Sequence, residues 1–146
     1  MPAKTSPPST IRLRILVRNP MPGVAVAMQI GRDDLQPPKP ATKAKLTFET
    51  EAKVTRAPSG DLRLTGPAIQ GPPNARFIYV NWGRRAGQKD TVWDRRAKVM
   101  VTTVDSKRIE ACLTKSATLE TEIDGIGKDG GPCCATVPLL GGWKLT

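Results

Sequence analysis

The chain has 146 residues, of which 38% are hydrophobic and 25% charged, a balance typical of one globular domain and not of a disordered chain. Its 23 Lys and Arg outnumber its 13 Asp and Glu, which gives a formal net charge of +10. The absence of histidine excludes Ser-His-Asp and Cys-His catalysis and zinc sites that use histidine ligands.

The N-terminal third predicts a tail, two strands and a loop. Residues 1–10, MPAKTSPPST, lack the apolar core of a signal peptide and predict a disordered tail. IRLRILVRN from Ile11 alternates apolar with mostly basic residues, which predicts a half-buried strand with a basic outer face. VAVAMQIGR follows a Pro-Gly turn and predicts a second strand, so we expect a hairpin. The proline-rich residues 33–45 predict a loop.

The remainder predicts further strands and one late helix. Strand patterns occur at KLTFETEAKVTR, LRLTGPAIQ, RFIYVNW, TVWDRRAKVMVTTV and TLETEID, while CCATV is a short apolar run before a tail, PLLGGWKLT. DSKRIEACLTKS predicts a helix, because Asp105 or Ser106 can cap it and Ile109, Cys112 and Leu113 form one apolar stripe. About eight short strands predict a mainly β fold (α+β by count): a single antiparallel barrel or sandwich over residues 11–146.

Residues 76–98, RFIYVNWGRRAGQKDTVWDRRAK, hold four of the six aromatic and seven of the 23 basic residues. Along RFIYVNW, both alternating faces are apolar, which favours a central strand whose aromatic residues are buried. The predicted loop GRRAGQKD then presents basic residues at an exposed tip between two tryptophans. Arginine can clamp oxyanions and indole rings can stack. We predict a site for an anionic ligand at Trp82, Arg84, Arg85, Lys89, Trp93, Arg95 and Arg96.

The distribution of charge supports an anionic partner. Residues 1–104 carry 18 Lys or Arg against 7 Asp or Glu, a surplus of +11, whereas residues 105–146 carry 5 against 6. Positive potential raises the local concentration of nucleic acid and of phosphorylated or acidic molecules. We therefore predict a non-catalytic binding module with such a partner, with no catalytic or metal site and no cofactor. A solvated hairpin end, with its tryptophans packed in the core, is the alternative interpretation.

Two other functions stay open. Tyr79, Glu120 and Glu122 would serve a small-molecule-binding or enzymatic barrel if they faced an internal cavity. The alternation of Glu120 and Glu122 with Leu119, Thr121 and Ile123 favours instead a solvated outer face. The second possibility is a protein–protein interaction through an exposed sheet edge. The oligomeric state is left open.

The cysteines and the C-terminal glycines give weaker signals. Three cysteines, with Cys133 and Cys134 adjacent, do not make a disulfide framework and predict a reducing, cytoplasmic setting. On a strand, adjacent side chains point to opposite faces, so this pair is predicted to be small packing residues and not metal ligands. GIGKDG matches GxGxxG in letters, but no helix pattern follows it, which predicts a turn. No apolar run is long enough to cross a membrane.

One resemblance rests on the string GPAIQGPPNARFIYVNWG, followed by WDRRAKVMV and the predicted helix. It resembles a family of small bacterial proteins known only as a domain of unknown function. In that family a Gly-Pro turn precedes an RFIY-type strand ending in Trp-Gly, and an RRAK strand comes before a short helix. The resemblance covers residues 11–143 and implies a stand-alone bacterial domain without an established activity. The proline-rich tail and the 33–45 loop depart from the family pattern.

Overall fold

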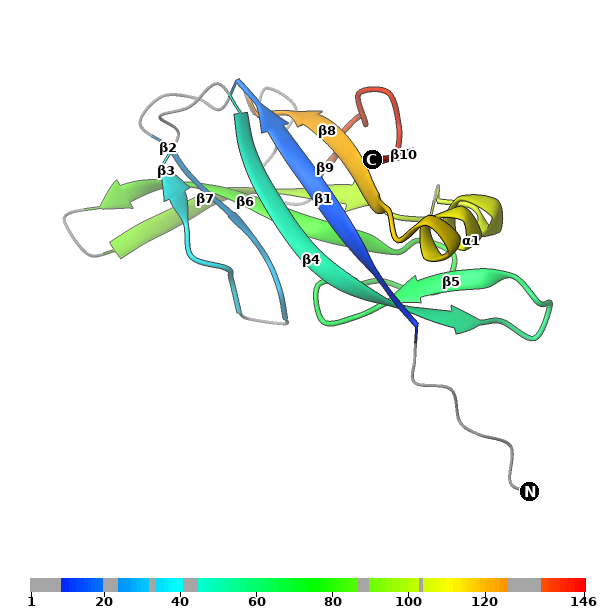
Figure 1. Ribbon diagram of the computed structural model, residues 1–146. Coiled ribbons are helices and arrows are strands. Elements are labelled where there is room, and N and C mark those ends of the chain that lie inside the picture. The colour runs from blue at the N-terminus through cyan, green and yellow to red at the C-terminus, as the bar shows by residue number, and fades with distance from the viewer. Residues whose placement is uncertain are drawn as a thin grey trace.

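The computed structural model describes seven stretches of the chain (Figure 1). They are residues 9–19, 24–31, 34–40, 45–86, 90–102, 104–125 and 135–146, without the side chains of residues 24, 40, 84–86, 90–95 and 135. Most of the predicted tail, residues 1–8, lies outside this description, and Thr10 already begins the first strand.

Within the described residues the fold is mainly β, with two five-stranded sheets and one helix. The first sheet has the order β10-β8-β1-β4-β5. Its strands are β1 (Thr10–Arg18), β4 (Lys45–Arg56), β5 (Leu62–Thr65), β8 (Thr118–Asp124) and β10 (Lys144–Leu145). Its long strands curve strongly across the front of the molecule in Figure 1.

The second sheet has the order β3-β2-β6-β7-β9. Its strands are β2 (Val24–Met28), β3 (Lys39–Pro40), β6 (Phe77–Ala86), β7 (Asp90–Met100) and β9 (Ala135–Thr136). β6 lies between β2 and β7, which confirms the prediction of a central strand with apolar residues on both faces.

The predicted hairpin between the first two strands is wrong. β1 pairs with β4 on one side and, in parallel, with β8 on the other, so both of its edges are taken within the first sheet. β2 instead pairs with β3 and β6 in the second sheet, so the chain changes sheets between its first two strands. β7 and β9 are parallel as well, so each sheet contains one parallel pair, while the other strand pairs are antiparallel as predicted.

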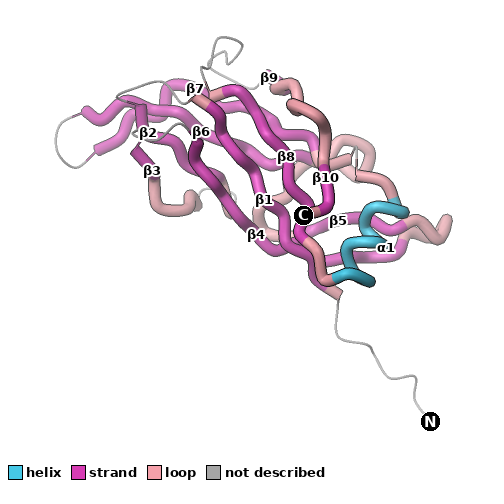
Figure 2. Tube along the Cα trace, turned by 45° about the horizontal axis from the view of Figure 1, so that its top comes forward, coloured by secondary structure: helices cyan, strands magenta, loops and turns pink. Residues whose placement is uncertain are grey.

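The two sheets face each other across a shared core and do not close into a barrel (Figure 2). The inward side of β1 shows why the sequence folds this way, since every second residue from Ile11 to Val17 is buried and the residues between them are not. Alternation of this kind buries one face of a sheet and leaves the other to solvent. The sequence prediction of a barrel or sandwich therefore resolves to two open, stacked sheets.

The helix α1 (Ser106–Lys115) forms where the sequence predicts it. Asp105 is the N-cap, and its carboxylate accepts a hydrogen bond of 2.8 Å from the backbone N–H of Arg108. Ser106 has another role: its hydroxyl oxygen accepts the backbone N–H of Leu62 in β5 at 2.8 Å. This bond joins the first turn of the helix to the first sheet.

The C-terminal segment, predicted to be a tail, belongs to the fold. Trp143 is 2% exposed and is the largest fully buried side chain of the described residues. Its indole N–H donates to the carbonyl oxygen of Met100 in β7 at 2.9 Å, while the next residues form β10 beside β8. The segment thus connects the edge of the first sheet to the second.

Candidate functional site

The β6–β7 hairpin, which carries the predicted site, is longer than the sequence indicates. β6 continues to Ala86 and β7 begins at Asp90, so the predicted loop GRRAGQKD is mostly strand. The backbone positions of Arg84 and Arg85 pair with β7 and are not at a loop tip. Lys89 lies outside the described residues, as do the side chains of Arg84, Arg85, Trp93 and Arg95.

Trp82 packs in the core. It is 5% exposed and shares the inward side of β6 with Ile78 and Val80. Its indole N–H has no hydrogen-bond partner among the residues that the structure describes. Of the predicted site, this tryptophan matches the alternative interpretation of an indole buried in the core.

The side of the same hairpin that faces away from the shared core gathers cations and aromatic rings. On this outward side Tyr79, Arg96 and Lys98 are half-buried, whereas Phe77 and Asn81 are buried. Residues directly opposite in an antiparallel pair share a face, and the register pairs Tyr79 with Lys98 and Asn81 with Arg96. Phe77 lies on this face two residues before Tyr79. We call Phe77, Tyr79, Asn81, Arg96 and Lys98 the cationic face.

Close contacts fix the side chains of the cationic face. The guanidinium carbon of Arg96 lies 4.8 Å from the ring centroid of Tyr79, and Nζ of Lys98 lies 4.7 Å from that of Phe77. The two rings meet edge to face, with centroids 4.7 Å apart and planes inclined by 63°. Nε of Arg96 also donates to Oδ1 of Asn81 at 2.9 Å. Cation–π contacts of this kind hold a charged group in one place.

This arrangement suits the binding of oxyanions. Since the cations cover the ring faces they contact, those faces are not free to stack on a base. Among the described residues neither Arg96 nor Lys98 forms an ion pair, and Nε accounts for just one of the five guanidinium N–H bonds of Arg96. The cationic face therefore offers two preorganised positive charges without internal counterions.

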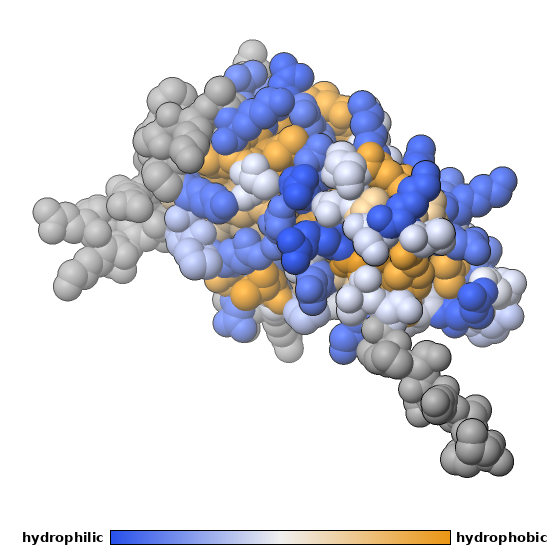
Figure 3. All heavy atoms as spheres, viewed as in Figure 1, coloured by the Kyte–Doolittle hydropathy of each residue, from blue (hydrophilic) through white to orange (hydrophobic). Residues whose placement is uncertain are grey.

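The carboxylates proposed for a cavity lie elsewhere. Glu120 and Glu122 are on the outward side of β8, alternating with buried residues, as the solvated-face interpretation predicts. Nε of Arg14 donates to Glu49 at 2.7 Å and its Nη1 to Glu120 at 3.1 Å, while Lys45 pairs with Glu122 at 3.3 Å. Figure 3 shows this face, over β1, β4 and β8, largely covered by hydrophilic side chains.

These ion pairs have a structural role. The hydrogen bonds to Glu49 and then to Glu120 raise the pKa of Arg14 above its ordinary value, so Arg14 stays charged between them. Tyr79 belongs to the other sheet and to its outward side, so the structure does not bring Tyr79, Glu120 and Glu122 to a common cavity.

Cys112 is the one cysteine that the structure describes, and it packs in the core. The buried thiol of Cys112 donates to the carbonyl oxygen of Ala117 at 2.7 Å, and burial raises its pKa. Cys133 and Cys134, and residues 126–130 of the predicted glycine turn, lie outside the described residues. In the part of the chain that the structure describes, no three acidic or cysteine side chains gather as metal ligands.

Sequence reasoning identified Arg96 but left Lys98, Phe77 and Asn81 out of the site. The signal was present, because Phe77, Tyr79 and Asn81 alternate on one side of one strand, and Arg96 and Lys98 on one side of the next. What was missing is the register that sets those two sides together.

The fold and this site define a mainly β, two-sheet domain with a preorganised cationic face. The chain belongs to the Family of unknown function (DUF5990), whose model matches residues 11–146. This confirms the prediction of an uncharacterised family covering most of the chain. No curated protein and no solved structure gives a match. No helix in the described stretches is long and apolar enough to cross a membrane.

Proposed function

We propose that this protein is a non-catalytic module that binds nucleic acid through its phosphate backbone, with the cationic face as the contact surface. The observation that carries the proposal is the pair Arg96 and Lys98, each held over an aromatic ring on the outward side of the second sheet. Fixing a long basic side chain before binding reduces the entropy lost when it meets a phosphate.

The spacing of the two cations supports a strand of phosphates. Arg96 and Lys98 are two residues apart on β7, which separates their backbone positions by roughly 6.6 Å. Neighbouring phosphates along a nucleic acid strand are separated on the same scale. The planar guanidinium of Arg96 can donate two parallel hydrogen bonds to one phosphate, and Lys98 supplies a point charge to the next.

The same geometry predicts little sequence preference. The rings of Tyr79 and Phe77 hold cations on the faces that a base would need for stacking. Contacts to phosphate carry no base information, so affinity depends on charge and falls as salt rises. The net charge of +10 adds long-range attraction.

The other residues of the predicted basic hairpin add positive charge close to the proposed surface. Arg84, Arg85, Trp93 and Arg95 belong to the same two strands as the cationic face, and Lys89 lies between those strands in the sequence. We include these five residues in the proposal, in a cytoplasmic setting, and leave out Trp82 because its side chain is part of the core.

The test is a salt titration of binding to a fluorescent single-stranded oligonucleotide of mixed sequence. We expect an association constant that falls linearly on logarithmic axes between about 50 and 200 mM salt. In the double variant Arg96→Gln/Lys98→Gln, the slope of log association constant against log salt should become less negative by about 1.4. Each lost phosphate contact on a single strand accounts for about 0.7 of this change.

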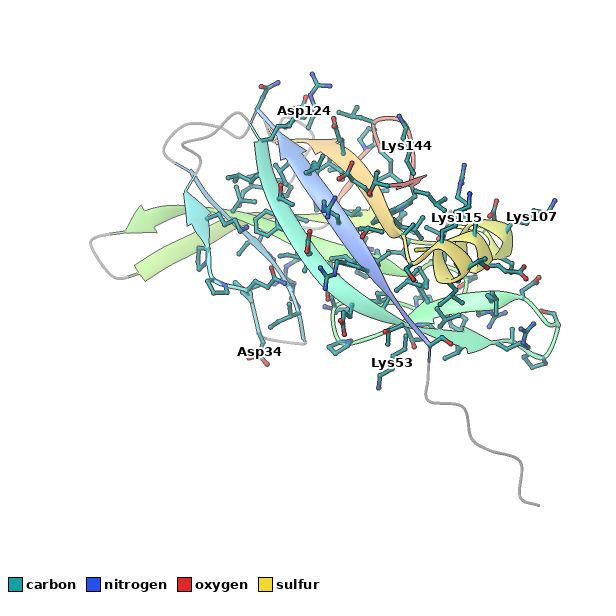
Figure 4. The ribbon with its side chains drawn as sticks, in the orientation of Figure 1. Asp34, Lys53, Lys107, Lys115, Asp124 and Lys144 are labelled. Atoms are coloured by element: carbon teal, nitrogen blue, oxygen red, sulfur yellow. The ribbon has the colours of Figure 1, made fainter. Side chains whose placement is uncertain are left out.

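The control variant Lys53→Gln/Lys115→Gln removes the same charge from two exposed lysines, which Figure 4 shows on β4 and on α1. It should keep the wild-type slope. No binding at low salt, or the same slope in the two double variants, would refute the proposal. Equal affinity for heparin would overturn the assignment to nucleic acid.

A further inference from the structure

A groove of about 580 Å³ lies where α1 meets the first sheet. Its walls come from β5, from the first turn of α1, and from the chain just before β6 and just after β7. Figures 1 and 2 both show α1 beside β5, and the bond from Leu62 to Ser106 joins these two walls. The groove is therefore built on hydrogen-bonded elements.

Arg76 is the distinctive residue of this groove. Its carbonyl oxygen accepts the backbone N–H of Val101 at 2.9 Å, which continues the β6–β7 ladder by one step. Because every second residue of a strand points to the same side, Arg76 lies on the inward side together with Ile78 and Val80. Nε of Arg76 is buried and has no hydrogen-bond partner in the described part of the chain. A buried charged donor without an acceptor is rare in folded proteins.

The other lining residues separate into an apolar floor and a charged rim. Leu64, Val101 and Val104 are buried and belong to the core cluster. Arg63 and Lys107 are exposed at the rim, and Figure 4 shows Lys107 projecting from α1.

Two carboxylates also line the groove, and each has a partner of its own. Asp105 caps the helix, and Oδ2 of Asp61 accepts the hydroxyl of Ser59 at 3.1 Å. The three basic residues of the lining therefore outnumber its two acidic residues.

We propose that this groove binds a small organic anion, with its carboxylate or phosphate on the guanidinium of Arg76 and its apolar part on Leu64, Val101 and Val104. An oxyanion would supply the acceptor that Nε of Arg76 lacks. The groove lies on the inward side of the second sheet and the cationic face on the outward side. The two sites are therefore separate, and this proposal does not depend on nucleic acid binding.

The test uses the fluorescent probe anilinonaphthalene sulfonate, which combines an anionic group with apolar rings. We expect the full-length protein to bind it with a fluorescence increase that saturates, and Arg76→Gln to weaken binding by about tenfold or more. Lys53→Gln, which removes an exposed positive charge outside the groove, should bind as the wild type does. Unchanged circular dichroism and thermal unfolding confirm that each variant is folded.

A second variant keeps the test decisive if Arg76→Gln does not fold. Thr102 is exposed and lines the groove, so Thr102→Trp fills the space without disturbing the core and should abolish probe binding. Octanoate should displace the probe from the wild type, whereas octanol, with the same chain and no charge, should not. Absence of probe binding, binding unaffected by Arg76→Gln and Thr102→Trp, or equal displacement by octanol would each overturn the proposal.

Discussion

Trp143 is expected to be among the most important side chains for stability, although it lies three residues from the C-terminal end of the sequence. Its indole fills the space between the edge of the first sheet and β7, and its N–H bonds to Met100. Trp143→Ala removes both contributions. Truncation of a buried tryptophan costs about 3 to 5 kcal/mol because the cavity left behind closes incompletely.

A loss of this size is large, because a domain of this kind has a total stability of about 5 to 15 kcal/mol. The variant Trp143→Phe separates packing from hydrogen bonding. Phenylalanine keeps much of the buried ring but leaves the carbonyl oxygen of Met100 without the indole donor. We expect Trp143→Phe to cost about 1 to 3 kcal/mol, between the wild type and Trp143→Ala.

The assay is urea unfolding followed by far-ultraviolet circular dichroism, which does not depend on the fluorescence of the substituted tryptophan. With a urea dependence of about 2 kcal/mol per molar, Trp143→Ala should lower the unfolding midpoint by about 1.5 to 2.5 M. A midpoint within about 0.5 M of the wild type would show that the C-terminal segment contributes little to the core, which would refute the reasoning.

Three further changes test other parts of the structure. Gly71→Ala should destabilise by more than about 2 kcal/mol in the same urea assay, because Gly71 has φ +94° and a Cβ there would collide with the carbonyl oxygen of Ala75; wild-type stability would contradict this. Arg14→Met should cost about 1 kcal/mol and lose most of that cost in high salt, because Glu120 then has no cation and Glu49 keeps only its 3.5 Å contact with Arg12; a cost independent of salt would argue against this. Burial raises the pKa of Cys112, so above about pH 9 the thiol ionises in the unfolded chain before it does in the folded one, and the free energy of unfolding falls as pH rises. Between about pH 8 and 10, Cys112→Ala should therefore lose less stability than the wild type, and equal losses would refute this.

Local patterns in the sequence predict the strands and the helix well. β1, β4 and β8 show their alternation directly, and the helix begins after the predicted cap Asp105. These features depend on neighbouring residues, because side-chain direction repeats every two residues on a strand.

The β6–β7 hairpin was predicted and is confirmed, but the pairings between strands far apart in the sequence were missed. The parallel pairing of β1 with β8 joins segments about a hundred residues apart, and no turn between them marks it. The C-terminal segment was missed for the same reason. PLLGGWKLT contains turn residues and only a short strand, and its hydrogen bonds are made to the distant strands β8 and β7. Burial of Trp143 is a tertiary effect.

The candidate site was only partly predictable from the sequence. The reason is a β-bulge, which interrupts the alternation of side chains along β7. Trp82 pairs with Arg95 while Gly83 pairs with Trp93, so Asp94 has no partner in the register. An extra residue shifts all positions beyond it to the opposite face relative to the partner strand. Strict alternation predicts the faces of residues 96 to 101 correctly, and the side chains of residues 92–95 lie outside the described residues.

The net charge of +10 alone does not locate a binding surface, but the pairing of the charges supports the proposed one. On the outward side of the first sheet, Arg14 and Lys45 are neutralised by Glu49, Glu120 and Glu122. On the outward side of the second sheet, the cations of the cationic face contact aromatic rings and an amide, with no ion pair among the described residues. An anion approaching the first sheet must compete with carboxylates already in place, whereas at the cationic face it meets positive charge that is fixed and uncompensated. The pairing of the charges therefore favours the second sheet for the proposed binding surface, even though both sheets carry basic residues.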